Sequence, residues 1–155
     1  MKIGVLICLL IVAGLSAQDA VVQTDAFAEA RRLGEGNQQW FFLFSTAYGS
    51  YVIRHDGLSE VGTPGLTRKF LLKPGMTGRV ERMYFQEHEG DLLLAFEAGD
   101  TGYVRRMNQK TRKMHWLTRI DANVVDQCMV QGNEVHCRSG DNVTKIDLKS
   151  GNHVT

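Results

Sequence analysis

The sequence has almost no net charge and only one long apolar segment. Of its 155 residues, 18 are Lys or Arg and 17 are Asp or Glu. Lys2 belongs to the apolar N-terminal segment, and without it the basic and acidic residues balance. A neutral chain has no general electrostatic attraction for nucleic acid or for acidic membrane surfaces. We therefore expect no nucleic-acid partner, and no membrane span after the first residues of the chain.

The sequence also lacks the short motifs of common catalytic and cofactor sites. It has no Gly-x-Ser-x-Gly nucleophile elbow, no phosphate-binding glycine loop, and no CxxC or HxxxH spacing that could begin a zinc site. The segment 87–91, EHEGD, places His88 among three acids, but it is typical of a hairpin turn whose side chains point in different directions. We predict no catalytic residues, no metal site and no cofactor.

The first 20 residues, MKIGVLICLLIVAGLSAQDA, have the layout of a secretory signal peptide. An apolar run follows Lys2, and the small residues Ser16 and Ala17 mark a cleavage site. The run is short for a bilayer span, although a retained membrane anchor is the alternative. We predict a signal peptide over 1–17, which removes Cys8, and an exported protein that is periplasmic or secreted.

The two remaining cysteines, Cys128 and Cys137, flank a hairpin signal. Gly132-Asn133 is a turn dipeptide, because both residues tolerate positive φ. A two-residue turn there places the two cysteines directly opposite one another at a non-hydrogen-bonded pair, with Cα atoms about 4.5 Å apart. That spacing suits a disulfide. We predict a structural disulfide, as expected in an exported protein, rather than a redox or zinc site.

Residues 79–155 consist of two similar units, each divided into four short β-prone runs. The separators in the first unit, 79–120, are Glu89-Gly90, Gly99-Asp100 and Lys110-Thr111-Arg112. The second unit is 122–155, and the stretch 104–116 aligns with 143–155 without a gap, at an offset of 39 residues. A period near 40 with four short strands per unit is typical of a propeller blade, and such units must stack face to face.

A third, more degenerate unit covers about 38–72 and includes a strand at 66–72. The predicted fold class is all-β, with antiparallel four-stranded sheets in a partial β-propeller of about three blades. Propellers close with about 4–8 blades, so three units leave open edges. We expect either a fragment of a longer propeller or self-association, with a small barrel or sandwich as the remaining alternative.

The repeated stretches VTKIDLKSG, 143–151, and VRRMNQKTRKMHW, 104–116, resemble pyrroloquinoline-quinone-type repeats, a WD40-like β-propeller family. Trp116 matches the family's tryptophan, whereas Arg112 stands where glycine is usual and Thr155 where the last tryptophan would be. The resemblance covers about half of the mature chain. It implies a propeller fold and, as an enzymatic alternative, a remnant of a periplasmic quinone-dependent dehydrogenase, for which we assign no calcium or quinone ligands.

Residues 101–120 carry six basic residues and no acid. Five of them form a possible surface for an anionic partner: Arg105, Arg106, Lys110, Arg112 and Lys113. The preceding segment, 79–100, has a net charge of −4. Because neighbouring strands of a meander lie side by side, we favour cross-strand charge pairs between the two segments.

The segment 18–37 that follows the signal peptide has a different pattern. Asp25 can cap a helix, Phe27 and Leu33 share one side, and Gly34 can end it, so a short helix is predicted, with an irregular strap against the sheet as the alternative. The run 40–44, WFFLF, is typical of a strand that is covered on both faces.

We therefore expect, over 38–155, a non-catalytic β-repeat domain for protein–protein interaction or scaffolding. Its open faces or edges would bind another protein or a copy of the same chain. Two alternatives to an interaction module remain. One is the dehydrogenase remnant, and the other is a small barrel that binds a sugar or lipid by stacking on Trp40, Tyr51 or Trp116.

Overall fold

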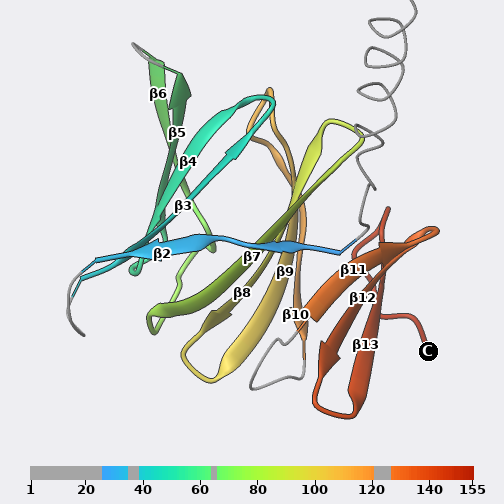
Figure 1. The fold of residues 1–155 in the computed structure, drawn as a ribbon. Helices are drawn as coiled ribbons and strands as arrows, with labels where there is room; N and C mark the ends of the chain where they lie inside the picture. The colour runs from blue at the N-terminus through green and yellow to red at the C-terminus, as the bar shows by residue number, and fades with distance from the viewer. Residues whose placement is uncertain (1–25, 35–38, 64–65, 121–126) are drawn as a thin grey trace, which may run out of the picture.

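The computed structural model describes residues 26–34, 39–63, 66–120 and 127–155, which contain strands β1–β13 and no helix (Figure 1). The strands form three antiparallel sheets that follow one another along the chain, and none of these sheets closes on itself. The fold class is all-β, as predicted. The predicted signal peptide, 1–17, lies outside the described residues. Within the described ranges, no helix could cross a bilayer.

The first and second sheets each have five strands, and the third has three. The first sheet has the order β2-β3-β4-β5-β6, with bounds Arg31–Leu33, Phe41–Thr46, Gly49–Arg54, Leu58–Thr63 and Leu66–Leu71. The second has the order β1-β7-β8-β9-β10, with bounds Ala28–Glu29, Val80–His88, Asp91–Ala98, Thr101–Asn108 and Met114–Ile120. The third has the order β11-β12-β13, with bounds Gln127–Gln131, Glu134–Ser139 and Asn142–Asp147. The prediction of four strands in every sheet is therefore wrong.

Residues 26–33 account for the extra strands. Ala26 forms a bridge to β11, β1 pairs with β7, and β2 pairs with β3. The backbone N–H of Phe27 donates to the carbonyl of Cys128, and that of Ala30 donates to β7, both at 2.9 Å. This segment, blue in Figure 1, therefore runs from the third sheet past the second to the first.

The predicted N-terminal helix is wrong where the segment is described, and the strap alternative fits it. A helix bonds its backbone groups internally, whereas an extended segment offers them to the strands that it crosses. The partners are β3 in the first sheet, β7 in the second and β11 in the third. Pairing with neighbouring sheets therefore overrides the local helix signal.

The second sheet is covered on both faces. Every residue of its central strand, β8, is buried. Leu92, Leu94 and Phe96 pack in the core shared with the first sheet, whereas Leu93 and Ala95 pack in the core shared with the third. The alternation of side chains along a strand explains this division, and a near-continuous apolar sequence is what a doubly covered strand requires.

Strand β3, in contrast, is covered on one face only. Phe42 and Phe44 are buried, but Phe41 is 36% exposed. The prediction that the run 40–44 forms a strand is confirmed, and the prediction that both of its faces are covered is wrong. No described segment packs on the outer face of the first sheet, so Phe41 points outward.

The cysteine hairpin has the predicted register. Cys128 lies opposite Cys137, and the pairs between them and the Gly132-Asn133 turn also match. The two cysteines form a disulfide with a Cα–Cα distance of 4.1 Å. Both are buried against the second sheet, so the disulfide is part of the core between the second and third sheets. It is consistent with an exported protein.

We predict that reduction of this disulfide lowers the free energy of unfolding by about 2 kcal/mol, because a bond that spans a sequence separation of nine constrains the unfolded chain only modestly. Urea unfolding with and without a thiol reductant measures the difference. A Cys128→Ala/Cys137→Ala double variant is the control, since its unfolding curve should not respond to the reductant. Identical curves for the wild-type protein in both conditions would contradict the prediction.

Candidate functional site

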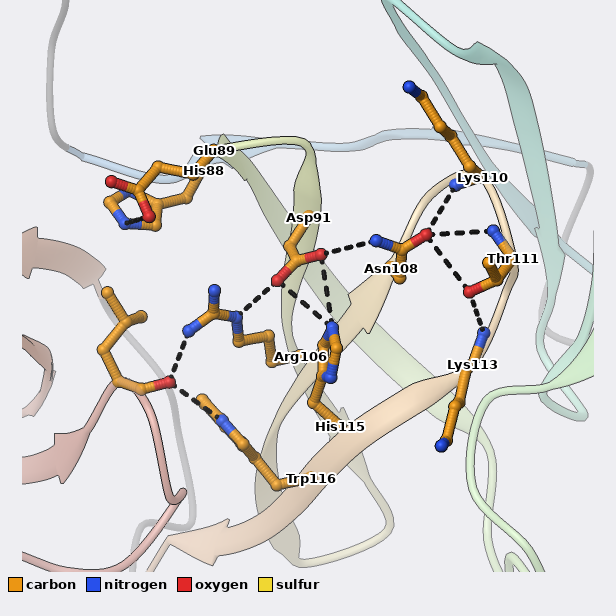
Figure 2. Close-up of polar contacts among 11 residues, drawn as sticks. His88, Glu89, Asp91, Arg106, Asn108, Lys110, Thr111, Lys113, His115 and Trp116 are labelled. Atoms are coloured by element: carbon orange, nitrogen blue, oxygen red, sulfur yellow. Dashed lines mark hydrogen bonds and ion pairs between the residues drawn. The ribbon is translucent and has the colours of Figure 1, made fainter.

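Polar side chains gather at the end of the second sheet where the β7–β8 and β9–β10 turns lie (Figure 2). Asp91, the first residue of β8, is only 6% exposed. Its carboxylate accepts hydrogen bonds from Arg106 Nε at 2.7 Å and from Asn108 Nδ2 at 3.2 Å. His115 Nε2 lies 3.3 Å from the same carboxylate. The buried carboxylate is therefore held by side chains of the two following strands.

This network continues into the third sheet. Arg106 Nη1 and Trp116 Nε1 donate to the carbonyl of Leu148 at 2.7 and 3.0 Å. Among the described residues, no serine or cysteine hydrogen-bonds to His115. The contacts of Arg106 and Trp116 with Leu148 connect the second sheet to the third.

The EHEGD segment forms the predicted turn. Glu89 and Gly90 have φ angles of 50° and 82°. Glu87 contacts the backbone N–H of Ala47, whereas Asp91 points toward Arg106 on the other side. The described residues contain no group of three His, Cys, Asp or Glu side chains that could hold a metal ion.

The five residues of the predicted anionic-partner surface do not lie together. Arg105 points toward the first sheet and Arg106 toward the third, because adjacent residues of β9 face opposite sides. Lys110, Arg112 and Lys113 lie in the β9–β10 turn. The pair of Arg106 with Asp91 is one cross-strand charge pair of the kind favoured from the sequence. Binding of an anionic partner stays a prediction, and the turn residues are those that could take part.

Arg105 is a buried connector between sheets. It is 4% exposed, and its Nη1 donates to the carbonyls of Leu71 and Leu72 in the first sheet. Its guanidinium carbon lies 5.1 Å from the ring centre of Phe70. Burial lowers the pKa of Arg105 to about 10. The guanidinium thus fastens the second sheet to the first, as Arg106 and Trp116 fasten it to the third.

Gln109, which sequence analysis did not single out, is a second connector to the first sheet. It is fully buried, and its Oε1 accepts from Thr46 at 2.7 Å and from the hydroxyl of Tyr51 at 3.2 Å. Its Nε2 donates to Glu87 at 3.0 Å. At the offset of 39, Gln109 aligns with Leu148, whose backbone carbonyl also takes part in a contact between sheets, although with different partners.

The turns at 108–113 and 147–152 repeat the same hydrogen bonds, which supports the alignment made from the sequence. In each turn the N–H of the fifth residue donates to the carbonyl of the first, at 2.9 and 2.8 Å. The N–H of the first donates to the carbonyl of the sixth, also at 2.9 and 2.8 Å. The side-chain oxygen of Asn108 or Asp147 accepts from the N–H of the fourth residue. Hydrogen bonds from Ser150 hold the pKa of Asp147 below its usual value.

Trp116 lies directly against Gly151 of the second turn. A Cβ atom built on Gly151 would lie 2.6 Å from Cγ of Trp116, and the φ of Gly151 is 76°. Thr118 donates to the carbonyl of the same glycine. The turn therefore needs glycine for its backbone conformation and for the close approach of the indole.

The outer face of the first sheet exposes apolar side chains, and we call it the open face. Its members are Leu33, Phe41, Leu43, Val52, Leu58 and Leu71. They form cross-strand pairs, with Leu33 opposite Phe41, Leu43 opposite Val52, and Leu58 opposite Leu71. Leu71 is 56% exposed.

The outer face of the third sheet is more polar. A shallow pocket of about 220 Å³ on this face is lined by Gln127, Met129, Gln131, His136, Arg138 and Val143. The two ends of the sheet stack therefore present different chemistry. The repeat pattern predicted open faces, but not which of them is apolar.

Comparisons of the chain with known protein families, with curated proteins and with solved structures found no match.

We predict that Gly151→Ala lowers the free energy of unfolding by about 2–4 kcal/mol, the sum of a strained positive φ and of overpacking against Trp116. Gly140→Ala is the matched control, because Gly140 also has a positive φ, 56°, but a Cβ atom added to it would meet nothing within 4 Å. The control should lose only about 1–2 kcal/mol. Urea unfolding of both variants measures the difference, and equal losses would show that the indole does not rest on this glycine.

Proposed function

We propose that the protein is an exported, non-catalytic β-repeat module that binds protein through the open face, and that a second copy of the chain occupies this face. The observation that carries the proposal is the set of three apolar cross-strand pairs on that face. Contiguous exposed apolar patches mark interaction sites in soluble proteins. The absence of an assembled catalytic set among the described residues favours binding over chemistry.

The packing inside the molecule supports a sheet as the occupant. The second sheet buries both faces against its neighbours, and the inner face of the first sheet packs with Phe42 and Phe44 in the shared core. The residues that alternate with these buried side chains along the strands of the first sheet point to the open face. A second sheet with an apolar face could cover it in the way that the sheets of this chain cover one another. The resemblance to propeller repeats, whose units stack face to face, agrees with this arrangement.

Self-association is favoured because apolar pairs on the open face of one chain can be covered by the same pairs of a second copy. Two-fold symmetric dimers place the same patch of each chain in contact, and they are the commonest oligomers. Charged residues lie on the same face: Arg54 is opposite Phe41, and Glu60 is opposite both Val52 and Lys69. They form ion pairs within the chain, Arg54 with Asp56 at 2.8 Å and Lys69 with Glu60 at 3.2 Å. A dimer would therefore cover apolar side chains beside charges that have partners.

We predict that the purified mature protein is a dimer by light scattering, and that Leu71→Lys raises the dissociation constant by at least about tenfold, which corresponds to about 1.4 kcal/mol. Leu71 is exposed in the single chain, so the substitution should leave the fold intact.

Val143→Lys is the matched control, because Val143 is 54% exposed on the outer face of the third sheet. This variant should remain a dimer. A wild-type protein that stays monomeric throughout a concentration series would overturn self-association. A dimer that only Val143→Lys disrupts would move the interface to the opposite end of the stack.

A further inference from the structure

We propose that a pocket between the first and second sheets binds a dianionic oxyanion of the phosphate or sulfate type. The pocket has a volume of about 280 Å³. Its lining includes Tyr48, Val61, Arg68, Gln109, Lys110 and Arg112. It lies beside the β9–β10 turn, away from the open face, and the inference does not rest on the proposed dimer.

Three cations line this pocket, and the carboxylate of Glu87 contacts one of the other lining residues, Gln109, at 3.0 Å. Arg68 Nη1 donates to the carbonyl of Lys110 at 3.5 Å, and Lys110 Nζ lies 5.9 Å from the ring centre of Tyr48. Arg112 Nη1 donates to the hydroxyl of Tyr51 at 3.4 Å. Within the described part of the chain, none of the three cations forms an ion pair, and no acid lines the pocket. A concave site with charge of one sign attracts the opposite charge.

Arg112 has donors to offer a ligand. Its Nε is buried and has no hydrogen-bond partner among the described residues. Buried polar groups are normally satisfied, and a guanidinium carries five N–H donors in a planar fork that matches an oxyanion. Only one of these donors, on Nη1, has a partner among the described residues. An oxyanion in the pocket would provide acceptors for the others.

The backbone of Arg112 gives a second reason to assign it a role. Its φ is 63°, a left-handed conformation that costs a non-glycine residue about 1 kcal/mol or more. The equivalent residue at the offset of 39 is Gly151, which adopts the same conformation without that cost. In the turn at 147–152, this position is a glycine that packs against Trp116. In the turn at 108–113, it is an arginine whose guanidinium lies over the ring of Tyr51. The arginine thus occupies a position that the fold itself would fill better with glycine.

The corresponding pocket between the second and third sheets serves as an internal comparison. It has a volume of about 380 Å³, and its lining is Glu89, Arg106, Asn133, Asp147, Leu148 and Lys149. Two acids and two bases there balance. Lys149 is the equivalent of Lys110 at the offset of 39. The lining of this pocket is therefore neutral, whereas the lining of the pocket between the first and second sheets has three positive charges and no acid.

The charge and the size of the pocket indicate the ligand class. Three cations favour a dianion over a monoanion, because each charge adds to the attraction. Arginine forks bind the oxygens of phosphate and sulfate in pairs, and the nearby lysine adds a point charge. The volume holds one such group together with a small substituent, so the ligand could be the free ion or a phosphate or sulfate ester at the end of a larger molecule.

The test is isothermal titration of the mature protein with inorganic phosphate, sulfate and acetate. Phosphate or sulfate should bind at one site per chain, and acetate should bind at least about tenfold more weakly. Glucose 6-phosphate and glucose 6-sulfate then distinguish an ester from the free ion. Equal binding of acetate would overturn the dianion assignment, and no binding of phosphate or sulfate would overturn the site.

Arg112→Gly is the decisive variant, since glycine suits the left-handed backbone and the variant should melt no lower than the wild-type protein. It should weaken phosphate or sulfate binding by at least about tenfold. Lys110→Gln should weaken binding several-fold, and the matched Lys149→Gln should leave it unchanged. Equal loss in Lys110→Gln and Lys149→Gln would mean that the anion responds only to net charge, and would overturn the pocket assignment.

Discussion

The burial of both faces of the second sheet is the constraint on which the rest of this structure depends. Each residue of β8 is buried, with alternate side chains committed to different neighbouring sheets. The second sheet alone would leave apolar side chains in water on both sides, so it needs the first and the third sheets at once. Within the described ranges, the first and third sheets each pack against a neighbouring sheet on one face only.

Directional contacts decide how the three sheets are placed, since apolar burial by itself is non-directional. The segment 26–33 pairs with a strand of every sheet, and this gives the three hairpin units a common edge. Arg105 binds carbonyls of the first sheet, and Arg106 and Trp116 bind the carbonyl of Leu148 in the third. Hydrogen bonds to backbone carbonyls are directional, so they fix the position of one sheet relative to the next. Apolar contact alone does not fix it.

The proposed functions both come from places where the units differ from one another. The turns at 108–113 and 147–152 share their hydrogen bonds, so the substitution of arginine for glycine between them changes the surface without changing the turn. The outer faces of the first and third sheets also differ, because one carries the leucine pair Leu58–Leu71 and the other carries glutamines and a histidine. Repetition supplies the scaffold, and departures from it supply the candidate binding surfaces.

The sequence by itself determined the local structure: the strand segments between residues 79 and 147, the turns between them, the hairpin register that joins Cys128 to Cys137, and the offset of 39. These depend on neighbours in the chain, through alternation and the positive φ of turn residues. The predicted fourth run of the last unit, 151–155, contributes only an isolated bridge at His153. Only the tertiary structure decided that 26–33 is extended, that β8 rather than β3 is covered on both faces, and that Arg105 and Arg106 point apart into different cores. Each of these depends on contacts between residues distant in the chain, and a local sequence pattern carries no information about which sheet will lie opposite.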